Sequence, residues 1–210
     1  MIVADVMNRV FREFGDEAKV QIDDTDIIRW INDGVKYITV SNNLLQATGT
    51  MNSVIDQSDY NFPTDMLSME AMYYNNLKLK YMKHTEFNEY VNSSDPNQDQ
   101  RGTPWMYTRW ANQFTLYPKP NTSYTNGIKL LYLQRPADIA STSDTVPLSL
   151  EYHPEIVKYC LQRAYQTDED WDAAGQMAGQ FQDGVDRLKE QETNKDREYY
   201  DTITILQDDL

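Results

Sequence analysis

Hydrophobic and polar residues follow a helical spacing at both ends of the chain and shorter, strand-like runs between them. In the first segment, apolar residues recur at every third or fourth position, which places them along one side of a helix that Gly15 ends. They are Val3, Val6, Met7, Val10 and Phe14. The pattern predicts a short amphipathic helix before residue 15.

A second helix is predicted over DDTDIIRWINDGVKYI, residues 23–38. Asp23 is suited to cap its amino end, and Asp26 falls near the positive end of the helix dipole. Its expected buried face consists of Ile27, Ile31, Val35 and Ile38. The opposite, solvated face, where charged neighbours make weak ion pairs, consists of Arg29, Asn32, Asp33 and Lys36. This stretch is interpreted as a packing element, with subunit contact as the main functional alternative.

Residues 44–135 have the composition of β structure, because runs rich in Tyr, Val, Ile, Met and Trp are separated by Asn, Asp, Gly and Pro. One hairpin is predicted from MEAMYY and LKLKYM, with a turn at Asn75 and Asn76, since Asn tolerates the positive φ of a tight turn. A second is predicted from WMYTRW and FTLYP, turning at residues 111–113. IKLLYLQ predicts a further strand that ends at Arg135.

Two segments interrupt these strands. TEFNEYV, residues 85–91, is expected to form two helical turns. The polar run NSSDPNQDQRG, residues 92–102, is expected to form a loop on a surface or on the wall of a lumen.

The pattern returns to helical spacing after Pro154, which suits a first helical turn. The expected buried stripe is Val157, Cys160, Leu161 and Ala164. A further helix is predicted to begin near Asp168, whose side chain is suited to cap it.

This last helix carries apolar residues in a heptad-like row. They are Trp171, Ala174, Ala178, Phe181, Val185 and Leu188. Such a row packs against a neighbouring helix at a shallow angle, and Gly175 and Gly179 would let that helix come close. The row is therefore predicted to be a subunit interface.

Together these patterns predict an α+β protein. It is expected to be a helical bundle of two amino-terminal and two carboxyl-terminal helices, with an inserted antiparallel β-sheet or sandwich region and an extended carboxyl-terminal tail. The expected boundaries are 1–43 with 148–193 for the bundle, 44–147 for the β-rich region and 194–210 for the tail. A chain of 210 residues is long enough to bury a core of its own.

The charge and composition of the chain limit the classes of partner that it can bind. The formal charge of −14, from 19 basic and 33 acidic residues, argues against binding of DNA phosphates or anionic lipids, which depends on clustered Lys and Arg. No signal-peptide pattern and no membrane-spanning apolar run is present, so the protein is expected to fold in a cytoplasm with no membrane partner. Cys160 is the single cysteine, which excludes an internal disulfide and a cysteine-based zinc site, and it is expected to be inert core.

Little in the sequence predicts catalysis, a cofactor or a metal. His84 and His153 are far apart and belong to no metal-binding pattern, and the acidic groups at residues 23–26 and 168–172 lack the Gly and distal Glu of a calcium loop. No phosphate-binding or esterase motif is present. The aromatic residues Trp105, Tyr107, Trp110, Phe114 and Tyr117 could stack on sugars or bases, but packing within the hairpin is the expectation.

The order of the motifs along the chain is more informative than any single motif. YNFPTDM at 60–66, GTPWMYTRW at 102–110, FTLYPKP at 114–120 and VPLSLEYHPEIVKYCLQRAY at 146–165 follow the helix over 23–38. This succession resembles the head-to-tail adaptor (connector) proteins of tailed bacteriophages over about residues 2–190.

The resemblance implies a structural virion protein without enzymatic residues or cofactors. Such adaptors form a homo-oligomeric ring, usually of twelve copies, below the portal protein. The ring links the capsid to a tail or nozzle protein and lines a channel that DNA passes through without specific binding. The expected location is the neck of the virion, after assembly in the host cytoplasm.

The resemblance also implies that the carboxyl-terminal segment reaches the portal, and its β-prone sequence is expected to become ordered only on assembly. The residues of this predicted portal-docking arm are Tyr199, Tyr200, Ile203, Ile205, Leu206 and Leu210.

Three alternatives stay open at this point. The first is a tail-completion or tail-nozzle ring further from the portal. The second is a glycan-binding β module that uses Trp105 and Trp110. The third is a hydrolase that uses Asp33 or Asp65, although neither has a partner group at a recognisable spacing.

Overall fold

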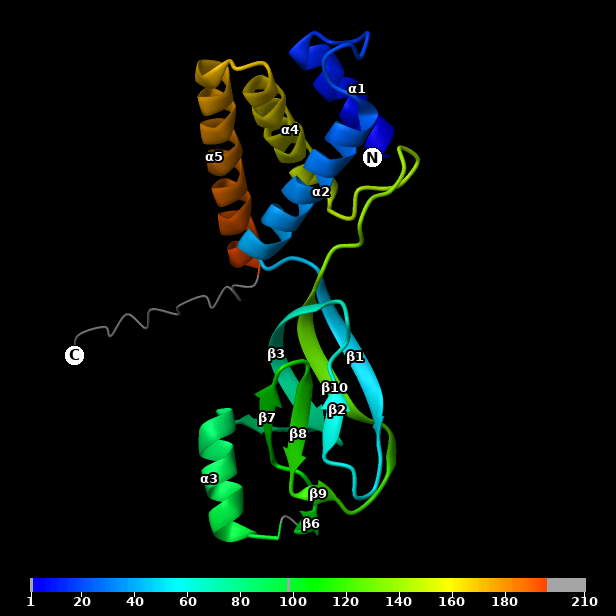
Figure 1. Cartoon of the computed structure of the whole chain (residues 1–210), viewed down its shortest axis with the longest axis vertical. Coiled ribbons are helices and arrows are strands. Elements are labelled where there is room, and N and C mark those ends of the chain that lie inside the picture. Colours follow the sequence, from blue (N-terminus) through cyan, green and yellow to red (C-terminus); the bar gives the residue numbers. More distant parts are fainter. Residues whose placement is uncertain (1, 98, 196–210) are drawn as a thin grey trace, which may run out of the picture. The chain divides into compact units, whose positions relative to one another are not determined.

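The computed structural model describes residues 2–97 and 99–195 and has an α+β fold (Figure 1). The chain divides into two compact units, one formed by Met1–Asn42 with Ala137–Leu210 and the other by Asn43–Pro136. Five α-helices and several antiparallel strand pairs lie within the described ranges, so the predicted α+β class is confirmed.

The first unit is helical. Its helices are α1 (Val3–Phe14), α2 (Asp24–Ser41), α4 (His153–Thr167) and α5 (Trp171–Lys195), with a short 3₁₀ helix at Leu150–Tyr152 before α4. Helix α4 contacts the other three, and α2 also contacts α1 and α5 (Figure 1). The core of this unit therefore surrounds α4.

Helices α1 and α2 form for the local reasons that the sequence predicts. Gly15 adopts φ +90° and its N–H donates to the Phe11 carbonyl, which ends α1. At the start of α2, the Asp23 side chain accepts a hydrogen bond from the Asp26 N–H at 2.9 Å. The predicted buried face of α2 is confirmed, whereas in α1 it is Phe11 rather than Phe14 that is fully buried.

Helix α4 carries Pro154 in its first turn, and its predicted buried stripe is confirmed. The predicted capping role of Asp168 is wrong. Asp168 ends α4, with its N–H donating to the Ala164 carbonyl at 3.1 Å, and the side chain of Asp170 caps α5 by accepting from the Ala173 N–H at 3.0 Å. Glu169 adopts a left-handed φ of 61° between the two helices, which moves the start of α5 two residues along the chain.

The second unit holds two four-stranded sheets. In the first, the strand order is β1 (Gln46–Ser53), β10 (Tyr124–Gln134), β3 (Met66–Tyr74) and β4 (Leu77–Lys78), all antiparallel. In the second, it is β2 (Asp59–Asn61), β8 (Gln113–Tyr117), β7 (Met106–Trp110) and β5 (Lys80–Tyr81). The pairs β5–β7 and β6 (Arg101–Gly102)–β9 (Lys119–Pro120) are parallel, so the β region is not purely antiparallel.

Side chains from both sheets form one aromatic-rich cluster in this unit. The cluster contains Tyr60, Phe62, Met72, Tyr74, Leu79, Tyr107, Phe114, Leu116, Ile128, Leu130 and Tyr132. On the other side of β7 and β8, helix α3 (His84–Ser94) buries Phe87 and Val91 against Met106 and Tyr117. The second sheet is thus covered on both faces.

The turns of both predicted hairpins are confirmed, but the second strand of the first hairpin is shorter than predicted: of LKLKYM only Leu77–Lys78 pairs with β3, and Lys80–Tyr81 pairs with β7. Asn75 and Asn76 have φ of 45° and 66° between β3 and β4, as a two-residue primed turn requires. The second turn lies at Ala111 and Asn112, while Gln113 already pairs with Trp110 as the first residue of β8. Helix α3 is longer than predicted, so the expected loop over 92–102 begins only after Ser94 and ends in β6.

Candidate assembly surfaces

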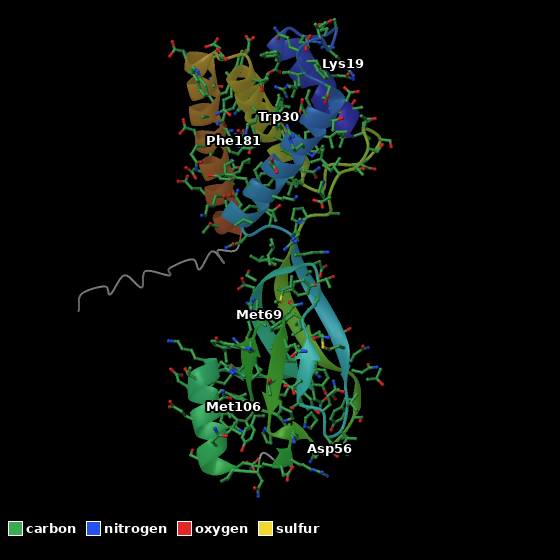
Figure 2. All side chains as sticks on the ribbon, in the orientation of Figure 1. Lys19, Trp30, Asp56, Met69, Met106 and Phe181 are labelled. Carbon is green, nitrogen blue, oxygen red and sulfur yellow. The ribbon has the colours of Figure 1, made fainter. Side chains whose placement is uncertain are left out.

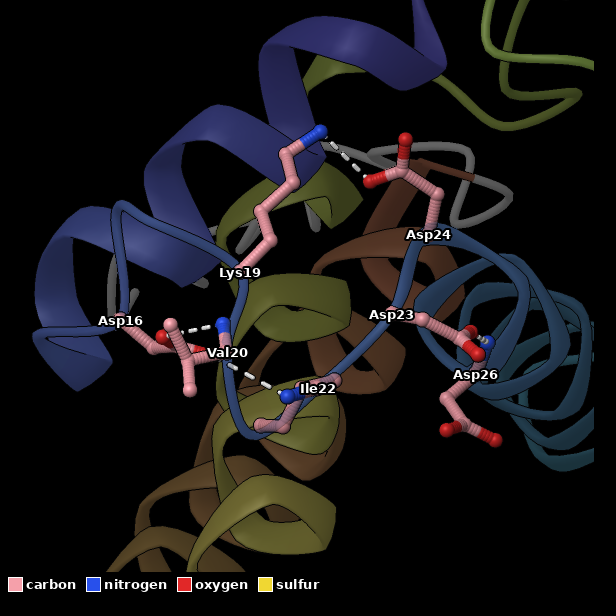
Figure 3. A network of polar contacts seen from close by, with 7 residues as sticks. All are labelled: Asp16, Lys19, Val20, Ile22, Asp23, Asp24 and Asp26. Atoms are coloured by element: carbon pink, nitrogen blue, oxygen red, sulfur yellow. Dashed lines mark hydrogen bonds and ion pairs between the residues drawn. The ribbon is translucent and has the colours of Figure 1, made fainter.

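The turn between α1 and α2 is fixed by one carboxylate (Figure 3). Asp16 is buried, and its two oxygens accept hydrogen bonds from the backbone N–H groups of Val20, Gln21 and Ile22 at 2.8, 2.9 and 3.1 Å. These bonds, with Val20 the strongest contributor, lower the pKa of the Asp16 carboxyl although its burial opposes them. The turn presents Val20 to solvent with 81% of its surface exposed.

The acidic residues that follow this turn all have structural partners. Asp23 caps α2, and Asp24 accepts from Lys19 Nζ at 2.6 Å (Figure 3). Asp26 accepts from Arg29 Nη2 at 2.6 Å. Across the described part of the chain, no three His, Cys, Asp or Glu side chains gather as metal ligands would. The packing interpretation of residues 23–38 accounts for each of these groups.

One residue of the predicted solvated face of α2 has a different role. The Asn32 side chain donates to the Ile139 carbonyl at 2.9 Å and accepts from the Ile139 N–H at 2.8 Å. Lys36 pairs with Asp138 at 2.9 Å beside it. The prediction of a uniformly solvated face is wrong, because this side of α2 holds the backbone that enters the helical unit after Pro136.

The apolar row of α5 is largely covered by helices of its own chain. Ala174, Phe181, Val185 and Leu188 are buried, and Ala178 is half-buried. The Phe181 ring contacts the rings of Tyr37 and Tyr159, with centroids 5.4 and 5.3 Å away. Figure 2 shows Phe181 pointing between α5 and its neighbours. That this row forms a subunit interface stays a prediction. In the single chain, four of its six residues are buried in the core of the helical unit.

A different side of α5 is open. Trp171 is 67% exposed, and a Cβ atom added to Gly175 or Gly179 would meet nothing within 4 Å in the described part of the chain. Residues four apart share one side of a helix, so these three make a continuous exposed surface, here called the α5 strip. Gly184, by contrast, lies against the side chain of Glu155 of α4.

The aromatic residues of the second hairpin fall into two groups. Tyr107, Phe114 and Tyr117 are buried, as predicted. The expectation of packing is wrong in part for the two tryptophans: Trp105 is 44% exposed and Trp110 67% exposed. Each ring nonetheless rests on α3, Trp110 stacked on His84 at 4.6 Å and Trp105 edge-on to Tyr90 at 5.9 Å.

Among the other candidate reactive groups, Cys160 and His153 are buried and Asp65 is hydrogen-bonded within its own unit. The Cys160 thiol is fully buried, and burial raises its pKa. His153 is 2% exposed, with its Nε2 3.0 Å from the Leu148 carbonyl, and burial lowers its pKa. The Asp65 carboxylate accepts from Gln134 Nε2 at 2.8 Å and from the Tyr132 hydroxyl at 3.3 Å, while Asp33 is exposed on α2.

The predicted portal-docking arm, which consists of Tyr199, Tyr200, Ile203, Ile205, Leu206 and Leu210, lies outside the described residues. Among the helices within the described ranges, none has the length and apolar character needed to cross a bilayer. Assembly surfaces can therefore be assigned only on the two folded units.

Comparison with known proteins identifies the family. A family model described as SU10 adaptor protein matches residues 1–205. None of the curated proteins compared with the chain matches it. Because the family match takes in nearly the whole sequence, the chain belongs to the SU10 adaptor protein family and is a structural adaptor-type protein of a phage.

Proposed function

We propose that this protein assembles into a ring of identical copies, twelve as in the adaptors that it resembles, below the portal of the phage head. The ring joins the capsid to a tail or nozzle protein and surrounds the channel through which DNA passes. The observation that carries this proposal is the family match over residues 1–205, and the open α5 strip supports the assembly of copies.

A ring of identical subunits needs a heterologous contact, in which one surface of a copy meets a different surface of the next. The α5 strip suits one half of such a contact. Glycine inside a helix costs about 1 kcal/mol relative to alanine. Gly175 and Gly179 carry that cost, although a Cβ atom added to either would meet no atom within 4 Å in the described part of the chain. Close approach by a helix of the next copy, beside the exposed Trp171 ring, gives both glycines a packing role.

The distribution of charge suits a conduit for DNA. Residues 43–136 contain eight basic and eight acidic residues, so the whole formal charge of −14 is carried by the rest of the chain. Proteins that hold DNA neutralise phosphates with clustered Lys and Arg. An acidic helical unit repels phosphates instead, and DNA can pass such a surface without being retained.

The proposal is tested on the purified full-length protein alone and with purified portal rings. Native mass spectrometry is expected to detect a closed oligomer, and electron microscopy of the mixture a stoichiometric complex with one adaptor ring on each portal ring. An adaptor that stays monomeric under both conditions contradicts the proposal. A ring that binds isolated tails but not portals assigns the protein to tail completion instead.

A further inference from the structure

The β unit has one long sheet edge without a strand beside it (Figure 1). Strand β1 has eight residues and pairs only with β10, so its other side has no strand partner within the described ranges. The other edge strands of the two four-stranded sheets, β4, β2 and β5, have two or three residues each. Because shortness protects a sheet edge from pairing with another chain, β1 is the edge most open to a further strand.

The register of β1 with β10 shows which of its backbone groups face the open edge. The Gln134 N–H donates to the Leu45 carbonyl at 2.9 Å, so these two residues form a hydrogen-bonded pair. Such pairs alternate along an antiparallel ladder, and the register is regular over residues 46–51. Odd-numbered residues of β1 therefore bond to β10, whereas Thr48 and Thr50 direct their N–H and C=O groups to the open edge.

The edge also has no charge that would keep a second copy away. Its sequence, QATGTMNS, contains no charged residue and no proline, the residues that commonly prevent edge pairing. Residues 43–136 contain eight basic and eight acidic residues, so two β units approach each other without net repulsion. The formal charge of −14 lies on the rest of the chain, which makes the β unit the more favourable place for two copies to meet.

Strand β1 is complementary to a second copy of itself. When two copies run antiparallel about Gly49, Thr48 of each lies opposite Thr50 of the other. Both threonines are exposed on one face of the sheet. On the other face Ala47 lies opposite Met51, and both are half-buried at the margin of the aromatic-rich cluster. Each side chain thus meets one of its own kind, and the residues with open backbone groups fall in hydrogen-bonded pairs.

We propose that two copies of the protein outside a ring pair through β1 in this register, which joins their four-stranded sheets into one continuous sheet. The pair has two-fold symmetry and closes after two copies, so it is not the contact that repeats around a ring. The inference therefore goes beyond the proposed function and concerns the protein at concentrations below those at which rings form. The pairing covers the edge and keeps it from other chains until assembly.

The experiment compares two doubly substituted full-length chains that differ only at position 48. Thr48→Glu with Thr50→Glu brings two carboxylates opposite each other in both Thr48–Thr50 pairs of the dimer. Thr48→Lys with Thr50→Glu brings opposite charges together in the same pairs. In both chains, position 50 pairs with Lys129 of its own sheet, so the glutamate has a favourable neighbour in the single chain.

Sedimentation equilibrium without portal rings measures the dimer dissociation constant. The unsubstituted protein is expected to form a dimer. The dimer of the variant with two glutamates should be weaker by about ten-fold or more, because like charges directly opposite each other destabilise paired strands. The variant with lysine at position 48 should stay within about three-fold of the unsubstituted protein. Pairing in any register that sets Thr48 opposite Thr48 would instead weaken both variants.

Hydrogen exchange measures the same contact without substitution. The amides of Thr48 and Thr50 should exchange quickly in the dilute monomer and become protected where the dimer dominates. The Gly49 amide, which bonds to β10, should be protected under both conditions. Protection of the two threonine amides that appears only after portal rings or tails are added assigns the edge to another protein and overturns the inference.

Three further outcomes overturn the inference as well. They are an unsubstituted protein that forms no dimer, equal dimer dissociation constants for the two variants, and loss of rings on portals in the variant with two glutamates, which would make β1 part of the ring contact. Absence of rings in the unsubstituted protein contradicts only the proposed function, because the dimer is measured without portals.

Discussion

Gly184 of α5 lies against the carboxylate of Glu155 on α4, so close that a Cβ atom added to the glycine would come to 2.0 Å from Glu155 Oε2. Glu155 is 2% exposed, and its two oxygens accept from Lys158 Nζ at 3.0 and 2.9 Å. A buried and paired carboxylate has little room to move aside. The missing side chain at position 184 is therefore what lets the two helices approach.

Substitution Gly184→Ala is expected to lower the free energy of unfolding by about 1–3 kcal/mol. The methyl group overpacks the contact with Glu155, and this cost exceeds the gain of about 1 kcal/mol in helix propensity. Urea unfolding of the monomer at low concentration measures the change. The control is Gly179→Ala, where no described atom lies within 4 Å and the same substitution should stabilise the protein by about 1 kcal/mol. Equal stabilisation by both substitutions would show that the helices do not meet at Gly184.

Substitution Asp16→Ala is expected to destabilise the turn between α1 and α2. Three backbone N–H groups lose their acceptor, so the amides of Val20, Gln21 and Ile22 should exchange with solvent faster, as hydrogen exchange by NMR would measure. The control Asp24→Ala removes only the exposed pair with Lys19 and should leave these amides protected.

The pH dependence of the same turn has a definite sign. The pKa of Asp16 is lowered in the folded protein, so its contribution to stability is present above its ordinary value of 3.8 and is lost as the pH falls through the lowered pKa. Protection of the three amides that persists unchanged far below pH 3.8 would contradict the role of the carboxylate.

The elements predicted most closely are those whose cause is local in the sequence. The Asn75–Asn76 turn, the Asp23 cap and the Gly15 helix end each depend on the conformational preference of one or two residues, and each is found where the sequence places it. Heptad spacing likewise located the buried side of α5, although not which chain covers it.

The features that sequence reasoning missed depend on residues far apart in the chain. Strand β1 has only Ala47 and Met51 as apolar residues, and its conformation is set by pairing with β10 more than 70 positions later. The partner of Asn32 lies 107 residues away, so nothing in the local sequence distinguishes its amide from that of a solvated side chain. The start of α5 was misplaced because acidic residues at both 168 and 170 suit a helix cap, and the left-handed Glu169 decides between them.

His153 is expected to make the helical unit less stable at mildly acidic pH. Burial lowers its pKa below the ordinary value of 6.5, so the unfolded chain takes up a proton before the folded chain does. Its contribution to stability is complete above pH 6.5 and is lost as the pH falls from there toward the lowered pKa, by at most about 1.4 kcal/mol per pH unit. Thermal unfolding between pH 5 and 8 measures the slope.

The control for this slope is His153→Gln, which keeps a polar side chain near the Leu148 carbonyl but does not titrate. A slope that survives His153→Gln would show that the loss of stability has another cause.

The α5 strip makes stability and assembly respond in opposite directions to one substitution. Gly175→Gln adds a good helix former where the single chain has open space, so the monomer should gain about 1 kcal/mol in unfolding free energy. The same side chain would clash with a helix from the next copy, so the fraction of protein in rings should fall at a given concentration.

Gln176→Ala, on an exposed neighbouring position, is the matched control and should change neither the unfolding free energy nor the free energy of assembly by more than about 0.5 kcal/mol. Sedimentation velocity measures the ring fraction and urea unfolding the monomer. A stabilised monomer that still assembles normally would move the subunit contact away from Trp171, Gly175 and Gly179, whereas a monomer that is not stabilised would show that Gly175 already packs within its own chain.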